Sequence, residues 1–257
     1  MPIWIMVIKN RLPCWPADGE DAFAPFRSRP LTPQPHEPAI KLPWQAVTLG
    51  LIIAAAYAAQ QGYGGGSPEP AAMLYGLSPE ELWNGGGSGL FTYILLNGGL
   101  TQVVLAVVMS VILATPLARR MPGVTGLLGL LSFFLLCGAA GGLVFAVLDP
   151  AGQDVLIGSS AAVSGLLAGA LRTAGRRDGV GPLSNRLLLA VGGVWLAVNL
   201  VAAFTDVIGR SAFSQYGWQA HVGGFIAGAL LAGPWLRLFG SRRTSFDSPP
   251  DLRDPSA

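Results

Sequence analysis

Two short segments of the chain combine residue types that can do chemistry near neutral pH. Residues 158–161 read GSSA and residues 220–224 read AHVGG, and each segment stands near the start of an apolar run of helical length. The chain has two histidines, His221 and His36, and His36 lies in a proline-rich region. A serine hydroxyl needs a base to accept its proton, and imidazole can accept and return a proton near neutrality. The pattern predicts Ser160 as a nucleophile and His221 as its base.

The composition is typical of a membrane protein. Of the 257 residues, 51% are hydrophobic and 12% are charged, and the mean hydropathy is +0.51. A helix that crosses the hydrocarbon needs about 20 mostly apolar residues. Such windows cover residues 43–61, 91–117, 124–148, 155–171, 186–205 and 219–239. We therefore predict an all-α membrane protein with six transmembrane helices, of which the fourth is the shortest and leaves room for water above it.

The distribution of Lys and Arg predicts the orientation, because cytoplasmic loops retain basic residues. Fifteen of the sixteen fall in the two terminal regions and in or beside the loops that join spans two to three and four to five, whereas Arg210 lies on the opposite side. Both termini are therefore expected in the cytoplasm. The net charge of +2 reflects this topology, and we expect no nucleic-acid partner.

Polar, proline-containing segments flank the predicted spans. Residues 1–41 contain eight prolines and mixed charge, and residues 240–257 are similarly polar. We expect both segments to be disordered cytoplasmic tails around a membrane domain of residues 42–239. A short amphipathic segment on the membrane surface is an alternative for residues 1–8.

The predicted topology brings Ser160 and His221 to the same depth. Spans four and six both run inward, so both side chains are expected near the outer leaflet, with Ser160 about five residues into its helix. Small residues spaced by four on each span favour a close crossing of the two helices. Packing alone is the simpler explanation of one intramembrane Ser or His. An ionisable group inside a bilayer nevertheless points to function, and we expect about 2.6–3.2 Å between Ser160 Oγ and the ring.

These segments together resemble the rhomboid family of intramembrane serine proteases, over about residues 88–235. Residues 136–142 (LCGAAGG) are similar to the glycine-rich third span of the family, residues 158–160 to its Gly-x-Ser element, and residues 220–224 to its Ala-His-x-x-Gly element. The resemblance implies a six-span rhomboid-like bundle and a Ser160–His221 dyad. In such a dyad Ser160 attacks a peptide carbonyl, and His221 acts as base and then as acid.

The family resemblance also implies the partners and the location. The substrate is a transmembrane helix of a single-pass or multi-pass membrane protein, which partly unwinds and enters beside the second and fifth spans. No metal or organic cofactor is implied. The expected location is a lipid bilayer, as a multi-pass integral protein of a bacterial inner membrane.

The sequence departs from the family pattern where the oxyanion would be held. The family usually has a His in the second span and an Asn four residues later, and those positions are Gln102 and Ala106 here. A glutamine amide can donate a hydrogen bond to an oxyanion, but alanine cannot. We therefore expect Gln102 and the backbone N–H of Ser160 as oxyanion donors, with Ser159 and Asn97 as further candidates. A plain helix–helix hydrogen bond is the alternative role of Gln102.

Other positions around the predicted dyad also differ from the family. Ala161 replaces the glycine that follows the nucleophile, and Ser164 replaces a residue that is often aromatic and stacked on the His. No carboxylate lies within the spans, so packing and hydrogen bonds must hold the imidazole. Asn199 is expected to make an interhelical hydrogen bond, and Trp195 to pack.

Two functional hypotheses follow from the sequence. The favoured one is a serine endopeptidase of rhomboid type that cleaves transmembrane or membrane-proximal peptide bonds slowly. The alternative is a proteolytically inactive rhomboid-like protein that binds transmembrane helices. A coupled transporter is disfavoured, because the spans show neither midplane ionisable groups nor inverted repeats.

Overall fold

The described part of the protein is built from helices alone. A computed structural model describes residues 42–65, 67–152, 154–176, 179–209 and 217–240, and the side chains of 202–209 are outside the description. The predicted tails fall outside these residues, apart from Gly240. In the described ranges, the β-pairing is one antiparallel bridge between Leu77 and Leu156. The predicted all-α class is confirmed.

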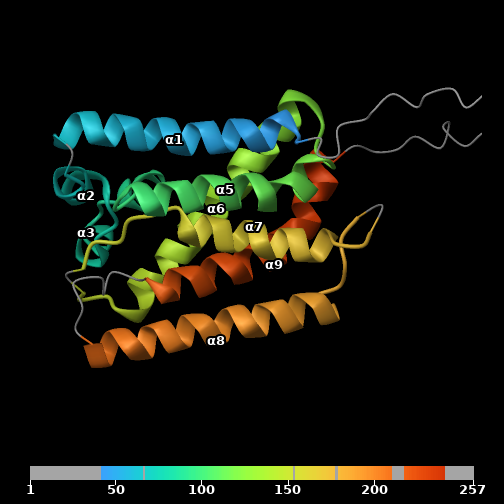
Figure 1. Cartoon of the computed structure of the whole chain (residues 1–257). Helices are drawn as coiled ribbons and strands as arrows, with labels where there is room; N and C mark the ends of the chain where they lie inside the picture. Colours follow the sequence, from blue (N-terminus) through green and yellow to red (C-terminus); the bar gives the residue numbers. More distant parts are fainter. Residues whose placement is uncertain (1–41, 66, 153, 177–178, 210–216, 241–257) are drawn as a thin grey trace, which may run out of the picture. The chain divides into compact units, whose positions relative to one another are not determined.

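Six longer helices and four short ones make up the described fold (Figure 1). The short helices α2, α3, α4 and the 3₁₀ helix η1 lie between the first two long helices; their bounds are Glu69–Tyr75, Pro79–Trp83, Gly89–Thr92 and Tyr93–Leu95. The long helices are α1 (Trp44–Gly64), α5 (Leu100–Ala118), α6 (Gly123–Leu148), α7 (Ser160–Thr173), α8 (Arg186–Gly209) and α9 (Trp218–Phe239).

Three of the described helices, α5, α6 and α9, are long and apolar enough to cross a membrane. α1 has 21 residues but carries Gln45, Gln60 and Gln61, and α7 has only 14 residues. In α8 the described side chains extend to Val201. The protein is therefore an integral membrane protein with an all-helical fold, and the count of six spans stays a prediction.

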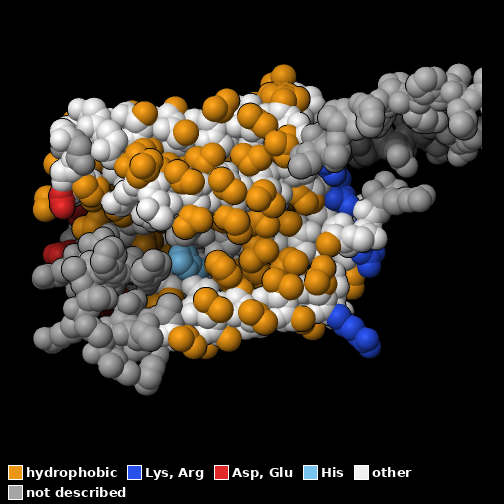
Figure 2. All heavy atoms as spheres, viewed as in Figure 1, with side chains coloured by type: hydrophobic (Ala, Val, Ile, Leu, Met, Phe, Trp, Pro, Cys, Tyr) orange, Lys and Arg blue, Asp and Glu red, His pale blue; other side chains and the backbone are white. Residues whose placement is uncertain are grey.

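α7 lies in the middle of the bundle. It packs against α5, α6 and α9, while α1 packs against α5, and α8 lies at the edge beside α9 and α7 (Figure 1). Large buried side chains fill the space around α6 and α7, among them Phe133, Phe134, Leu130 and Leu166. Hydrophobic side chains cover the middle of the face in Figure 2, with Lys and Arg gathered at one end and Asp and Glu at the other.

Glycines allow α7 and α9 to approach with their backbones nearly in contact. A Cβ added at Gly224 would lie 2.0 Å from the carbonyl oxygen of Ala161, and one at Gly228 would lie 2.2 Å from that of Gly165. No larger residue fits either position without moving a helix. The close crossing expected from the small residues of the two spans is therefore confirmed.

α7 begins later than the sequence suggested. The apolar run 155–171 predicted a helix from residue 155, but the helix begins at Ser160. The preceding segment is extended at Leu156, whose backbone pairs with Leu77, and Gly158 has φ +124°, which residues with a Cβ rarely adopt. Ser160 is therefore the first residue of α7 rather than a residue one turn inside it.

The start of α5 differs from the prediction for a similar reason. The apolar run 91–117 predicted one continuous helix, but residues 91–95 belong to α4 and η1, and the chain leaves the helical path at residues 96–99 before α5 begins at Leu100. η1 ends at Leu95, and the segment NGG that follows favours irregular backbone. Asn97 therefore lies in a buried turn, where its backbone is available for contacts with α1.

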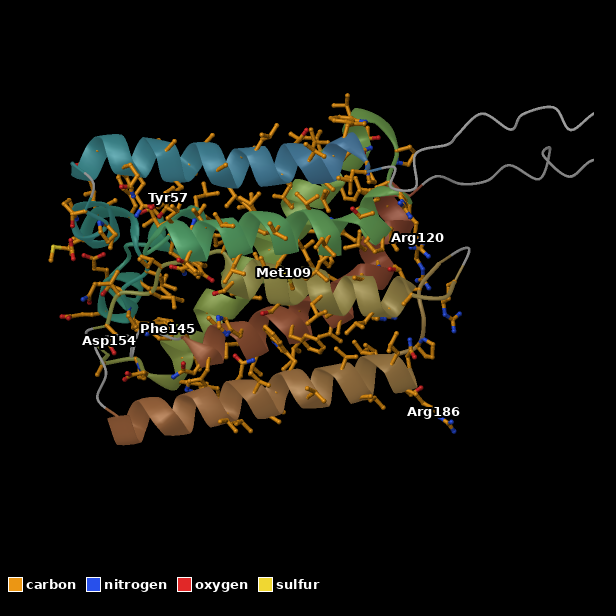
Figure 3. All side chains as sticks on the ribbon, viewed as in Figure 1. Tyr57, Met109, Arg120, Phe145, Asp154 and Arg186 are labelled. Carbon is orange, nitrogen blue, oxygen red and sulfur yellow. The ribbon has the colours of Figure 1, made fainter. Side chains whose placement is uncertain are left out.

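Two arginines tie the helices together at the end opposite the start of α7. Arg172 donates from Nε and Nη2 to the carbonyl oxygen of Gly181, and from Nη1 to that of Ala229 in α9. Arg120 donates to the carbonyl oxygen of Thr173 at 2.9 Å. Cations at helix C-terminal ends are favourable electrostatically. The labelled Arg120 and Arg186 lie at this end in Figure 3, and Asp154 lies at the other.

Replacing Gly228 by Val should destabilise the bundle. The added side chain must push α7 and α9 apart, and overpacking of this kind typically costs about 1–3 kcal/mol. Thermal unfolding in detergent micelles measures the effect as a lower Tm. Gly193→Val is the matched control, because a Cβ at Gly193 meets nothing within 4 Å. Equal Tm values for the two variants would contradict the tight crossing.

Candidate active site

Ser160 and His221 meet at the same end of two adjacent helices. Ser160 opens α7, and His221 lies in the first turn of α9. Ser160 Oγ is 2.8 Å from His221 Nε2, within the range expected from the sequence. Both residues are half-buried, so the pair is partly accessible. This geometry permits transfer of the Ser160 proton to the imidazole.

Glycines of α6 make room beneath this pair. A Cβ at Gly141 would lie 2.4 Å from the carbonyl oxygen of Ala220 and 2.8 Å from the Cβ of Ala161. The residue before His221 and the residue after Ser160 therefore both rest on one glycine. The glycine-rich segment 136–142 thus has a local packing reason.

The second ring nitrogen of His221 also has a partner. Nδ1 lies 2.6 Å from Asn199 Oδ1 of α8, and Asn199 Nδ2 donates to the carbonyl oxygen of Trp195 at 2.8 Å. The sequence predicted an interhelical hydrogen bond for Asn199 without its partner. The signal was present, because Asn199 is a polar residue in an otherwise apolar stretch of α8 and such residues in membrane helices are often functional.

An aromatic ring stands beside the imidazole, but α8 supplies it. The ring centroids of Trp195 and His221 are 6.3 Å apart and the rings are tilted by 38°. The position where an aromatic residue was expected from the family is Ser164, whose hydroxyl donates to the carbonyl oxygen of Ser160 at 2.9 Å within α7. Trp195, predicted only to pack, is therefore an edge of the site.

The amide nitrogen of Gln102 and the hydroxyl of Ser160 both lie beside Gly158. The N–H of Gly98 donates to Gln102 Oε1 at 2.7 Å, so the amide oxygen is engaged and the NH₂ group points away from that loop. A Cβ built at Gly158 would lie 2.8 Å from Gln102 Nε2 and 3.7 Å from Ser160 Oγ. The amide donor and the hydroxyl thus flank the same glycine.

Other polar groups surround this corner of the bundle. Ser159 Oγ and both side-chain polar atoms of Asn97 are buried and have no hydrogen-bond partner. Ser159 makes no side-chain cap on α7, so it leaves the first N–H groups of that helix uncapped. Free N–H groups at a helix start favour negative charge. Ala106 is buried in α5 and offers no donor, as expected.

A glutamine of α1 holds the turn before α5. Gln60 Oε1 accepts from the N–H of Asn97 at 2.9 Å, and Gln60 Nε2 donates to the carbonyl oxygen of Asn97 at 2.8 Å. The next residue, Gly98, holds Gln102. Gln60, which lies near the end of α1 and is buried, was not predicted from the sequence as a residue that supports the site. α1 therefore reaches the site through the side chain of Gln60, which contacts the backbone of the turn.

The site lies within a part of the chain that matches a known protein family. The family model described as Rhomboid domain matches residues 79–237. The chain belongs to the rhomboid family. The match runs from α3 into α9 and includes Gln102, Ser160, Asn199 and His221, whereas α1 lies outside it. A search of curated proteins finds no match to this rhomboid.

The described residues of this rhomboid contain no group of three or more His, Cys, Asp or Glu side chains that could hold a metal ion. Cys137 is a free, buried thiol of α6 that packs against Gly165. The polar groups around Ser160 are therefore amides, hydroxyls and one imidazole. Such groups suit proton transfer and the stabilisation of an oxyanion.

Replacing Gln60 by Leu should loosen the turn before α5. The substitution leaves the N–H and the carbonyl of Asn97 buried without their partner, at about 1–3 kcal/mol for each group. We expect a lower Tm in detergent micelles and faster amide exchange at Asn97 and Gly98. Gln61→Leu, at the neighbouring and more exposed glutamine, is the control. Equal exchange rates in both variants would show that Gln60 does not hold the turn.

Proposed function

We propose that this rhomboid is an intramembrane serine endopeptidase with Ser160 as nucleophile and His221 as general base. The observation that carries the proposal is the 2.8 Å contact between Ser160 Oγ and His221 Nε2. Nε2 takes the hydroxyl proton as Oγ attacks the peptide carbonyl, and then gives it to the departing amine. A water molecule repeats the sequence on the acyl ester and regenerates the serine.

The oxyanion of each tetrahedral intermediate would form near two sets of donors. One is Gln102 Nε2, which lies beside Gly158 while the Gly98 N–H engages the amide oxygen of the same side chain. The other is the N–H groups at the start of α7, beginning with that of Ser160. Ala106 stands where the family usually has an Asn, and its methyl group donates no hydrogen bond to the oxyanion. We therefore expect active but slow proteolysis.

The proposed topology has six spans and cytoplasmic termini, with membrane domain 42–239 between cytoplasmic tails 1–41 and 240–257. The separation of basic and acidic side chains to opposite ends supports this orientation (Figure 2). The basic end then faces the cytoplasm of a bacterium, and Ser160 lies toward the outer leaflet. α7, as the shortest span, would begin below the membrane surface, where water can reach it.

The proposed substrates are transmembrane helices of other membrane proteins, which enter beside α5 and α8. α8 is the edge helix, and it borders the His221 side of the site. His221 itself is half-buried, so part of its ring is accessible from outside the bundle. A substrate segment would unwind only where it reaches the dyad, because the backbone groups of an unwound segment find no hydrogen-bond partners in lipid.

Covalent labelling with a fluorophosphonate separates this function from an inactive helix-binding protein. We expect the probe to label the wild type, and Ser160→Ala and His221→Ala to lose labelling and cleavage of a reconstituted transmembrane substrate. Ser164→Ala is the control, because it removes a neighbouring hydroxyl that bonds within α7. A folded wild type that resists labelling would favour the inactive binder.

Gln102→Leu tests the proposed oxyanion donor. Loss of one such donor typically lowers kcat about 10²–10³-fold. We expect this fall in kcat with little change in KM, measured on the reconstituted substrate. Gln45→Leu is the matched control: Gln45 is also buried, and it donates to the carbonyl oxygen of Met121 at the other end of the bundle. An unchanged kcat in Gln102→Leu would leave Gln102 with only a structural role.

A further inference from the structure

Asn199 is a buried amide on a helix that otherwise faces outward. Among the described side chains of α8, residues 186–201, only Leu188 and Asn199 are buried. Neighbours on the same helix are open, such as Val194 at 65% and Val198 at 56% exposed. An unpaired buried amide in such a place is costly. The contacts of Asn199 with His221 and with the carbonyl oxygen of Trp195 offset this cost.

The hydrogen bonds of Asn199 select one tautomer of His221. Asn199 Nδ2 is committed to the carbonyl oxygen of Trp195, so the atom that faces the ring is the acceptor Oδ1. An acceptor 2.6 Å from Nδ1 requires the ring proton on Nδ1. A neutral imidazole carries one N–H, so Nε2 presents its lone pair to the hydroxyl of Ser160. This is the tautomer that a general base needs.

The attachment of α8 to the bundle is narrow. Leu188 forms a small apolar cluster with Ala168 of α7 and Ala229 of α9, against which Phe225 packs. A Cβ at Gly192 would lie 2.9 Å from Phe225 Cζ, so α8 approaches α9 closely at this glycine. Beyond it, Asn199 and Trp195 are the contacts with His221. Contact of α8 with α9 therefore decides whether Asn199 reaches the imidazole.

We propose that Asn199 is the positioning residue of His221, that it completes a Ser160–His221–Asn199 triad, and that docking of α8 against α9 switches the dyad on. The consequence of this role rests on the proposed protease function, whereas its geometry rests on the contacts of His221 Nδ1 with Asn199 and of Nε2 with Ser160. When α8 swings outward, Nδ1 loses its acceptor, and the ring is free to rotate or to exchange tautomers. Ser160 and His221 are therefore able to react only when α8 is docked against α9.

The tautomer is measured directly by ¹⁵N NMR on protein labelled at histidine. The chain has two histidines, so His36→Gln leaves His221 as the single signal. We expect a protonated Nδ1 and an unprotonated Nε2 in the parent, and a mixed population in Asn199→Leu. Asn199→Asp keeps the acceptor and should restore the parent spectrum. A parent spectrum in Asn199→Leu would overturn the proposal, and this readout does not depend on proteolysis.

Fluorophosphonate labelling measures the consequence for reactivity. Loss of tautomer control lowers kcat about 10⁴-fold in serine proteases with a buried carboxylate, and a neutral amide should matter less. We expect Asn199→Leu to slow labelling about 10²-fold and Asn199→Asp to recover most of it. If the parent shows the expected tautomer but is not labelled, the protease function fails and the positioning role stands. Equal labelling of Asn199→Leu and parent would overturn the positioning role.

The dependence on α8 docking is tested without touching the triad. Gly192→Leu places a side chain against Phe225 and wedges α8 away from α9, whereas Gly193→Leu adds the same bulk where a Cβ meets nothing within 4 Å. We expect Gly192→Leu to show the mixed tautomer population and slow labelling, and Gly193→Leu to match the parent. Identical behaviour of the two variants would overturn the docking switch.

Discussion

The need to pair irregular backbone inside a bundle of membrane helices is the constraint on which the rest of this structure depends. Lipid satisfies no hydrogen bond, so a chain that leaves the helical path inside a membrane must find partners within the protein. Here the segment before α7 is paired by Leu156 with Leu77, and by the N–H of Gly158 with the carbonyl oxygen of Tyr93. Those contacts allow α7 to begin inside the bundle, and they leave its first N–H groups free beside a hydroxyl.

The contact of α7 with α9 brings His221 to the start of α7, where Ser160 lies. Backbone oxygens of α7 occupy the space where side chains of Gly224 and Gly228 would stand. The two helices are thus fixed in register, and Ser160 and His221 meet from the first turns of α7 and α9. Around them, each oriented amide gains its direction from a backbone group: Gln102 from Gly98 and Asn199 from Trp195.

Much of this arrangement follows from local signals in the sequence, and the rest depends on partners distant in the chain. Apolar length predicted the helices, and small residues predicted the crossing of α7 and α9. The late start of α7 escaped prediction, because an apolar run does not distinguish helix from a buried extended segment. Gln60 was overlooked and the partner of Asn199 was not predicted, because a polar residue in a span does not reveal its partner until the helices are packed.

The arginine contacts hold the chain in place just before α8 begins. Arg172 ties Gly181, shortly before α8, to α7 and α9, and Leu188 anchors the first turn. Asn199 lies about 17 Å beyond Leu188 along the helix, at 1.5 Å per residue. On a lever of about this length, about 3° of tilt moves the amide by about 1 Å, enough to break a hydrogen bond. Lateral pressure from the surrounding lipids would therefore change the contact between Asn199 and His221 by tilting α8 about the end that Arg172 holds.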